Sequence, residues 1–518
     1  MTTAAAGFHA EVDEPTYRRR IWAWTMYDWA NSAFATTILA AVLPVYYSQV
    51  AGSTLPSPAV ATAYWSTGIS ISLLIAAIIS PILGTISDVK RGKKPFLSIF
   101  VGLGVVGTGL LVLVDTGDWL LASILFIVGR VGFTAANVFY DALLPHVARE
   151  ADRDAVSTRG YAMGYLGGGL LLAVNIVMIQ LLPGTWGPRL SFLSVAIWWA
   201  LFSIPILRIV PEPPAAEASL APGQSVLSVS FGRLRDTLRD IRQYRQLFKF
   251  LLAFLIYNDG IGTIIAVAAI YGAELGFGTL ELVLALLLVQ FVGIPYSLIF
   301  GRLPTGADQR RGFYLAFVLF NLVALPLVGL AGAELLPADV TGAGVERLSN
   351  LGVILASVAG LELVLLGLAY FTGRPLFSTL AARIDTKRSI LIGLTFYAVI
   401  AVWGFFLDSV WEFWFLAWMV AVVQGGSQAL SRSLYASMSP ASKSGEFFGL
   451  FGIMEKFSAF TGPLLFAAAV GIFGRSQPAV LSLVVFFLAG GWLLTKVDVG
   501  EGRRVAQQED ARARLGVS

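Results

Sequence analysis

Long apolar stretches separated by short polar breaks run through almost the whole sequence. Each stretch spans about 20 residues, the length that an α-helix needs to cross the hydrocarbon core of a bilayer. The pattern predicts an all-α polytopic membrane protein with fourteen transmembrane helices. They lie near residues 21–48, 60–83, 95–114, 119–143, 160–183, 189–210, 247–271, 279–301, 312–333, 350–372, 390–407, 412–434, 446–473 and 478–497.

The longest polar break, residues 211–246, divides the predicted helices into six and eight. It opens with prolines and continues into a basic stretch, whose spacing suggests a short amphipathic helix on the membrane surface. The predicted organisation is an N-terminal tail (1–20), a six-helix bundle (21–210), a linker (211–246), a C-terminal bundle (247–497) and a C-terminal tail (498–518).

The basic residues set the predicted orientation, because cytoplasmic loops carry an excess of Lys and Arg. With the N-terminus in the cytoplasm, 31 of the 36 Lys and Arg residues fall on the cytoplasmic side or at helix ends that touch it. Three lie outside (Arg189, Arg347 and Arg475), and two lie within spans (Arg130 and Lys456). An error in the helix count would place the basic residues after it on the opposite side of the membrane. We therefore expect a multi-pass protein of the cell membrane with both termini cytoplasmic.

Composition agrees with a bilayer environment and removes several classes of chemistry. Hydrophobic residues make up 57% of the 518 residues and charged residues 13%, about half of the roughly 25% charged residues typical of soluble domains. The chain has no cysteine, only two distant histidines, His9 and His146, and no P-loop motif. We expect no enzyme, cofactor, metal site or nucleic-acid partner. The expected partners are the lipid bilayer and a small-molecule solute, with proton or ion coupling left open.

The two parts of the chain echo each other. The segment 27–31 (YDWAN) in the first span corresponds to 257–260 (YNDG) in the first span after the linker. The loop 84–94 after the second span is echoed by 383–388, but only after a long interval. Removing roughly 304–380, with its two spans, restores a plan of six plus six helices. We interpret that pair as an insertion, because repeated halves are typical of secondary transporters.

Several of these motifs resemble one transporter family. The loop 84–94, with Gly84, Asp88, Gly92 and Lys93, is similar to the signature loop of the major facilitator superfamily and departs from it by one residue between Asp88 and Gly92. More specific segments resemble the branch that contains the fungal autophagy-related vacuolar amino-acid effluxer and its bacterial relatives: 27–34, 139–142, 257–260, 424–433 and 446–449. The resemblance implies a two-bundle fold and amino-acid efflux.

Ionisable side chains inside the predicted spans require an explanation, since each costs at least ~2.5 kcal/mol near mid-bilayer by insertion scales. Asp259 and Arg130 are the deepest, about 18 and 20 Å from the cytoplasmic helix ends. With the insertion removed, the polar residues fall on helices 1, 4, 7, 8, 10 and 11, and in the resembled family helices 1, 4, 7 and 10 line the central cavity. The predicted substrate or coupling residues are Tyr27, Asp28, Asn31, Arg130, Asn258, Asp259, Gln290, Gln424, Glu455 and Lys456.

A second group lies at the cytoplasmic helix ends, where it is expected to act as a gate. Asp141 is about two residues from such an end and is expected to tie to the loop 84–94. The predicted gating residues are Gly84, Asp88, Arg91, Gly92, Lys93, Asp141, Arg383 and Asp385. Glu362, deep in the second inserted helix, is expected to hold the inserted pair together.

The leading hypothesis is a secondary active transporter that moves a small polar or zwitterionic solute by alternating access. Asp28 and Asp259 would bind an ammonium group, and Arg130 or Lys456 a carboxylate. A rival within transport is proton-coupled export of drugs, which is disfavoured because the fifth span lacks the Gly-Pro pair usual in drug antiporters. A rival of another class is a non-transporting receptor or scaffold, which is disfavoured because buried charges occupy matched positions in both halves.

The predicted topology can be tested with reporter fusions. Fusions at Ser409 and Gln477 should report an external location, and a fusion at Lys443 an internal one, because they lie on opposite sides of the predicted spans. An external reporter at Lys443 would mean that the inserted pair has been miscounted.

Overall fold

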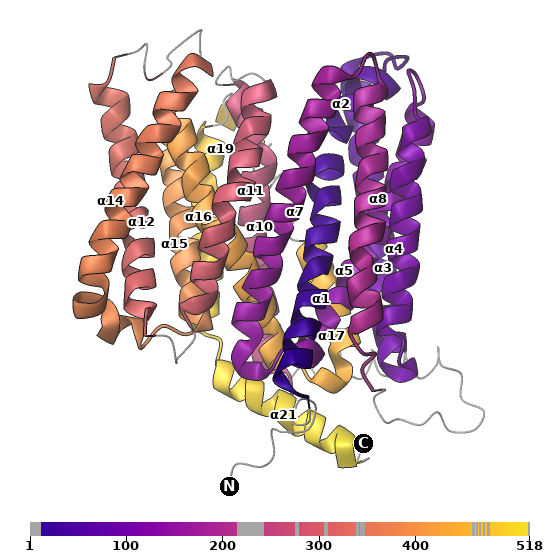
Figure 1. The fold of residues 1–518 in the computed structure, drawn as a ribbon, viewed down its shortest axis with the longest axis vertical. Helices are drawn as coiled ribbons and strands as arrows, with labels where there is room; N and C mark the ends of the chain where they lie inside the picture. Colours follow the sequence, from indigo (N-terminus) through magenta and orange to yellow (C-terminus); the bar gives the residue numbers. More distant parts are fainter. Residues whose placement is uncertain are drawn as a thin grey trace.

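The computed structural model describes residues 12–214, 243–274, 279–304, 309–337, 341, 348–457 and 477–515, with scattered positions between 462 and 473. Within these ranges every regular element is a helix. The helices stand roughly parallel in two bundles, which follow each other along the chain (Figure 1). An all-α polytopic fold is therefore confirmed.

The N-terminal half is built from six long helices joined by short elements. The long helices are α1 (Glu14–Ala33), α3 (Pro58–Lys90), α4 (Lys93–Leu110), α5 (Trp119–Ala142), α7 (Arg153–Leu181) and α8 (Trp186–Ile209). The short elements are η1 (Phe34–Ala41), α2 (Leu43–Tyr46), η2 (Tyr47–Ala51), η3 (Leu111–Leu113), α6 (Leu144–Val147) and η4 (Glu150–Asp152). Both η1 and η2 are π-helical, so the first span is irregular beyond α1, on either side of Pro44, which has no N–H to donate.

The C-terminal half contains the inserted pair and a final helix outside the bundle. Its elements are α10 (Arg245–Glu274), α11 (Thr279–Arg302), α12 (Arg311–Leu335), α14 (Leu348–Ala381), α15 (Thr386–Phe406), α16 (Val410–Met438), η5 (Ala441–Lys443), α17 (Ser444–Phe457), α19 (Gln477–Ser482), α20 (Val484–Thr495) and α21 (Val499–Leu515).

Thirteen helical segments of the described part are long and apolar enough to cross a membrane, and they coincide with thirteen of the fourteen predicted spans. The remaining predicted span, 446–473, begins with α17 and continues into residues that are largely outside the described ranges. The amphipathic helix predicted within the linker also falls outside them, since residues 215–242 are not described.

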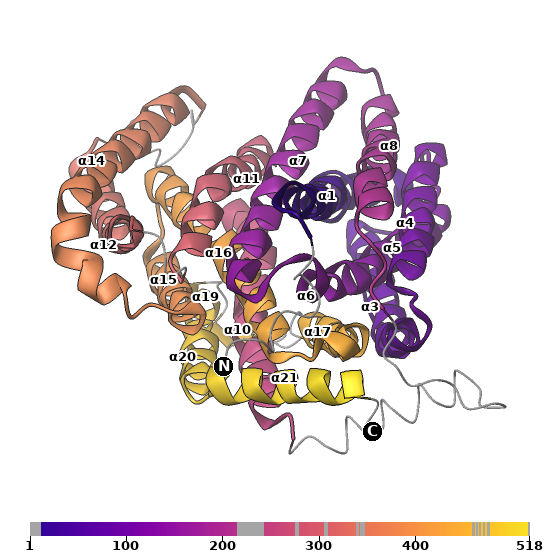
Figure 2. The ribbon, with the colours of Figure 1, turned by 60° about the horizontal axis from the view of Figure 1, so that its bottom comes forward.

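The inserted pair, α12 and α14, lies at one edge of the molecule (Figures 1 and 2). Helix α12 packs against α14 on one side and α16 on the other. Helix α14 leaves one apolar face uncovered, where the exposed fractions of Leu363 and Phe371 are 70% and 76%. Hydrocarbon is the natural solvent for such a face. The pair thus lies at the periphery, as an insertion would, and the six-plus-six plan stays a prediction.

Helix starts follow local capping signals in the sequence. The hydroxyl of Ser57 accepts a hydrogen bond from the N–H of Val60 at the start of α3, and the carboxylate of Asp385 accepts one from the N–H of Arg388 at the start of α15. Ser409 and Glu412 form a capping box at the start of α16, with the indole N–H of Trp403 donating to Glu412 as well. These caps fix the helix ends that carry the functional loops.

Small residues let α1 and α7 approach closely. A Cβ atom at Gly160 would overlap Asp28, and one at Gly164 would lie about 2.5 Å from the Ser32 hydroxyl. These glycines form a packing seam, because only glycine leaves room for the facing helix. This seam brings Asp28 directly against α7.

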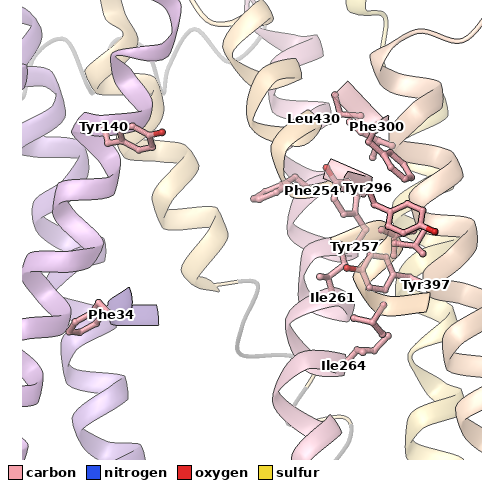
Figure 3. Packing of buried hydrophobic residues seen from close by; sticks show 14 of the residues in the cluster. Phe34, Tyr140, Phe254, Tyr257, Ile261, Ile264, Tyr296, Phe300, Tyr397 and Leu430 are labelled. Atoms are coloured by element: carbon pink, nitrogen blue, oxygen red, sulfur yellow. The ribbon is translucent and has the colours of Figure 1, made fainter. Parts of the chain in front are cut away.

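Aromatic and aliphatic side chains fill each bundle. Figure 3 shows Tyr257, Ile261 and Tyr397 gathered inside the C-terminal half, with Tyr140 apart from them in the N-terminal half. The hydroxyl of Tyr257 shares a hydrogen bond with Ser431, at 2.7 Å, so that α10 and α16 are tied by a polar as well as an apolar contact. Across the described residues, the buried apolar side chains of the two halves form one continuous cluster in this state.

Helix α21 lies across one end of the two bundles (Figures 1 and 2). We call this end, where α1 begins and α21 lies, the terminal face. Lys443 donates to Glu509 of α21 at 2.6 Å, and the N–H groups of Ala441 and Ser442 donate to Asp510. Gln507 donates to Glu150 of the N-terminal half. The predicted C-terminal tail is therefore largely a helix that contacts both halves.

Candidate functional site

One guanidinium joins the two halves near the terminal face. Arg432 of α16 forms ion pairs with Asp28 of α1, at 3.3 Å, and with Asp141 of α5, at 3.1 Å. Only 5% of the Arg432 side chain is exposed. Two carboxylates from the N-terminal half therefore converge on one cation from the C-terminal half.

The remaining donors and the faces of this guanidinium are also occupied. Its Nε atom donates to the hydroxyl of Ser157 at 2.9 Å, and one of its terminal nitrogens donates to the Ser157 carbonyl at 2.9 Å. The rings of Trp24, Tyr140 and Tyr161 surround it, with centroids 4.9, 5.5 and 4.7 Å from Cζ. Because charge-assisted bonds strengthen in a low-dielectric site, this cluster holds the halves together firmly.

A hydrogen bond within the N-terminal half also positions the carboxylate of Asp28. The hydroxyl of Tyr140 donates to Asp28 at 2.7 Å, and the indole N–H of Trp24 donates to the carbonyl of Tyr140 at 3.1 Å. Trp24 and Tyr140 also stack, with centroids 4.4 Å apart. The motif segments 27–34 and 139–142 are therefore in contact, which explains why both carry aromatic residues beside an acid.

The loop between α3 and α4 closes a second connection between the halves. Asp88 accepts hydrogen bonds from the N–H groups of Gly445 and Glu446, at 3.0 and 2.8 Å, and from the ammonium of Lys93, at 2.6 Å. The N–H groups at the start of a helix attract a carboxylate, so Asp88 of the N-terminal half caps α17 of the C-terminal half. A Cβ atom at Gly84 would overlap the carbonyl of Gly445, so the two backbones touch.

Further contacts cross between the halves at the same end. Thr386 donates to Asp154 at 2.7 Å, Ser157 donates to the carbonyl of Ala429 at 2.7 Å, and the ring of His146 shares a hydrogen bond with Ser444. These contacts and the two above lie in the parts of the helices nearer the terminal face. The structure therefore shows a state that is closed on that side.

The predicted gating residues are placed as follows. Arg91 adopts a left-handed conformation (φ 54°) and ends α3, directly before Gly92. Asp141 lies with Arg432, and this ion pair takes the place of the expected tie to the loop 84–94. In the echoed loop Asp385 caps α15, and the carbonyl of Arg383 accepts a hydrogen bond from Arg388. There the contact between halves is made by Thr386.

Arg130, predicted from its depth, has no counter-ion among the residues that the structure describes. It lies on α5, twelve residues before the end of the helix, which is about 18 Å at 1.5 Å per residue. Its Nε atom is buried without a hydrogen-bond partner, and its Cζ atom lies 5.7 Å from the centroid of the Phe126 ring. Among the described residues no carboxylate pairs with Arg130.

Other candidate residues from the C-terminal half lie at similar depth. Asp259 of α10 is buried and accepts a hydrogen bond from the N–H of Gly462 at 2.8 Å, next to the half-buried Asn258. Gln290 of α11 packs against Gly169 of the N-terminal half. Gln424 and Glu455 are half-buried on α16 and α17.

The remaining predicted site residues lie on α1 and α17. Asn31 donates to Asn137 at 2.7 Å, which ties α1 to α5, and Tyr27 is fully buried against Tyr140. The side chain of Lys456 lies outside the described residues.

The hydroxyls of Tyr165 of α7 and Tyr397 of α15 are buried without a partner, and they come from opposite halves. Buried polar atoms are normally satisfied by protein, water or ligand. These two hydroxyls are therefore available to a water molecule or a polar solute. In the described residues no cluster of His, Asp or Glu is suited to hold a metal ion.

Arg432 is not among the site residues predicted from the sequence, although it lies in the motif segment 424–433. The predicted span ended at 434, which placed Arg432 at the membrane boundary. Helix α16 continues to Met438, so Arg432 lies about 9 Å inside the helix end. Ser157 was missed because its role depends on contacts between the two halves.

Electrostatics also favour the docked position of α21. Burial opposes ionisation of the Glu509 carboxyl, but the hydrogen bond and charge of Lys443 outweigh burial, so the pKa of Glu509 lies below its ordinary value. The carboxylate therefore stays ionised at neutral pH, and the pair with Lys443 persists.

Comparisons with known proteins agree with this arrangement. The family described as "Vacuole effluxer Atg22 like" matches residues 55–345 and 348–507. The chain is 34% identical to the uncharacterized MFS-type transporter YxiO of Bacillus subtilis, over 94% of this chain and 96% of that protein. It is 21% identical to autophagy-related protein 22-1 of Penicillium rubens, over 95% of this chain and 92% of that protein.

Solved structures with the same fold are also found. The human organic anion transporter MFSD10 aligns with a TM-score of 0.61 at 13% identity, over 92% of this chain and 99% of that chain. The proton:xylose symporter XylE aligns with a TM-score of 0.59 at 14% identity, over 96% and 100%. At these identities the likeness shows the fold, while the family match extends over most of the sequence. The chain therefore belongs to the Atg22-like family of major facilitator superfamily transporters.

Proposed function

We propose that this transporter exports small zwitterionic solutes, foremost amino acids, across the cell membrane by alternating access. In this proposal both termini are cytoplasmic, so the terminal face is the cytoplasmic side. Two matched halves, a site between them at membrane depth and a closed connection on one side are the parts that such a cycle needs. The description of the matched family as a vacuole effluxer supports efflux, and the charges at the site support a zwitterion.

The observation that carries the proposal is the unpaired guanidinium of Arg130. An Arg near mid-bilayer is costly unless it is paired or faces a polar cavity. No carboxylate of the described residues serves it, so the missing partner is an anionic group brought by the solute. A carboxylate fits, because it accepts two parallel hydrogen bonds from a guanidinium.

The opposite half supplies the complementary charge. Asp259 lies on α10, the counterpart of α1 in the repeated plan, and its carboxylate suits the ammonium group of an amino acid. A solute that bridges Arg130 and Asp259 would connect the two halves. Binding of that kind favours a conformation in which both groups face the solute together, and so shifts the population between states.

The cluster around Arg432 supplies the cytoplasmic gate. In the structure it holds α1, α5, α7 and α16 together, so opening toward the cytoplasm must separate Arg432 from both carboxylates. Separation in a buried setting costs several kcal/mol, and water entering the gap offsets part of it. Asp28 and Asp141 therefore become accessible only in the state that is open to the cytoplasm. In that state Asp28 can take part in solute binding.

The role of Arg130 can be tested by counterflow in proteoliposomes loaded with pooled amino acids. Arg130→Ala should raise the solute concentration needed for half-maximal exchange by roughly 10- to 150-fold, because it removes a charge-assisted interaction of ~1.5–3 kcal/mol. Arg189→Ala is the matched control, since Arg189 pairs with Asp115 at a helix end in the same half and should leave exchange unchanged. Equal exchange by Arg130→Ala and the parent protein would refute the solute site.

The gate can be tested independently of the solute. The chain has no cysteine, so Lys90→Cys and Arg383→Cys allow one spin label on each half at the terminal face. Pulsed electron paramagnetic resonance should give mainly short distances in the parent protein. Arg432→Gln strands two buried carboxylates, at a cost of ~3–5 kcal/mol to the closed state, and should add a population at longer distances.

A variant at Gly84 disturbs the closed contact without removing a charge, and so distinguishes the two effects. Gly84→Ala should also add long distances, because its Cβ atom would overlap Gly445. Gly102→Ala, where a Cβ atom meets nothing within 4 Å, is the control that should not. If Arg432→Gln and Gly84→Ala both keep the parent distance distribution, these contacts are not the gate.

A further inference from the structure

A polar group that the transport mechanism above does not use lies between the inserted pair and the core. Glu362 occupies the middle of α14, fourteen residues after Leu348 and hence about 21 Å along the helix. Its Oε2 atom lies 2.7 Å from the hydroxyl of Tyr296 on α11 and 3.3 Å from the side-chain nitrogen of Asn321 on α12. The expectation that Glu362 ties α14 to α12 is met, but the contact also reaches α11 of the core.

The hydrogen atoms in this cluster do not suffice if Glu362 is ionised. The Tyr296 hydroxyl has one proton but two acceptors within reach, Glu362 Oε2 at 2.7 Å and Asn321 Oδ1 at 3.2 Å. Asn321 is held in this orientation because its amide nitrogen donates to the carbonyl of Phe317 at 3.0 Å. A carboxylate can only accept, so one of the two short contacts would lack a proton.

A proton on Glu362 completes the chain. The carboxylic acid then donates from Oε2 to the oxygen of Tyr296, and Tyr296 donates to Asn321 Oδ1. Every short contact is filled in this arrangement. The Oε1 atom is buried without a partner, which is costly for a carboxylate and much less so for the neutral carbonyl of an acid.

The surroundings provide no positive charge that would keep Glu362 ionised. The groups that face it are the hydroxyl of Tyr296 from α11, the amide of Asn321 from α12 and the indole of Trp418 from α16. Among the described residues no Lys, Arg or His pairs with it. The neighbouring residues Leu363 and Val364 are 70% and 59% exposed on the outer face, where the bilayer and not water is the solvent.

We propose that Glu362, Tyr296 and Asn321 form a proton-binding site, in which Glu362 is a neutral acid in the state shown. Release leaves a carboxylate and transfers the proton to water that reaches the site when α11 moves. After loss of the proton the Tyr296 hydroxyl can donate to Glu362 or to Asn321 but not fully to both, so one contact between α11 and the inserted pair is lost and occupancy of the site is coupled to the position of α11. Helix α11 also carries Gln290, six residues before Tyr296, against the N-terminal half.

The coupling part rests on the proposed function, since it makes transport of the zwitterion proton-dependent through the inserted pair. The proton-binding part does not rest on it. The assignment also gives the insertion a role: it supplies a protonatable group at membrane depth without placing it in the central site.

Infrared spectroscopy of the reconstituted full-length protein tests protonation directly. At neutral pH the parent protein should show the C=O stretch of a protonated carboxylic acid that shifts in D₂O and that disappears in Glu362→Gln. Tyr296→Phe should move this band, because the acid loses its hydrogen-bond acceptor. Glu334→Gln, the same change at an exposed position near the end of α12, should leave it in place. Identical carboxylic acid bands in the parent protein and Glu362→Gln would overturn the proposal.

Transport assays test the coupling. Glu362→Gln mimics the protonated acid, so it should keep exchange of amino acids at equal pH. The rate of uptake driven by a pH gradient should fall at least tenfold. Glu334→Gln should keep both. Full gradient-driven uptake by Glu362→Gln would overturn the coupling. Failure of the proposed function is distinguishable, because then the parent protein would exchange no amino acid while the infrared band persisted.

Discussion

The contact between Arg432 and the carboxylates of Asp28 and Asp141 is the interaction on which the rest of the arrangement depends. In a low-dielectric interior, a guanidinium with two carboxylates is strongly bound, and each partner is costly when left alone. The helices that carry these groups come from both halves. The state of this single cluster therefore determines whether the halves can separate on the terminal face, and the Asp88 cap on α17 supports the same closure through the backbone.

The fold follows from the sequence because it depends on properties that the bilayer imposes on every segment. Span length can be recognised within one segment, and the basic residues and the six-plus-six echo follow the alternation of loops between the two sides of the membrane. Thirteen spans lie where they were predicted. Helix starts that carry a local signal, such as the cap formed by Ser409 and Glu412, can also be recognised from nearby residues alone. The position of the inserted pair followed from the same echo.

The site was less predictable, because its pairings depend on contacts between distant segments. Depth alone identified Arg130, and the part of the chain that the structure describes provides no counter-ion for it. Depth could not show that Asp28 and Asp141 share Arg432, or that Glu362 reaches Tyr296 of α11. The helix boundary was the decisive detail for Arg432, since four further residues of α16 turn an apparent boundary charge into a buried one.

The central claim is that a zwitterion bound at Arg130 controls the closure made by Arg432. It is tested most directly by the distance between spin labels on the two halves at the terminal face, measured with and without a saturating mixture of amino acids. The account predicts that the mixture redistributes these distances in the parent protein and leaves them unchanged in Arg130→Ala, which keeps the gate but lacks the solute site. An identical shift in both proteins, or none in the parent, would contradict it.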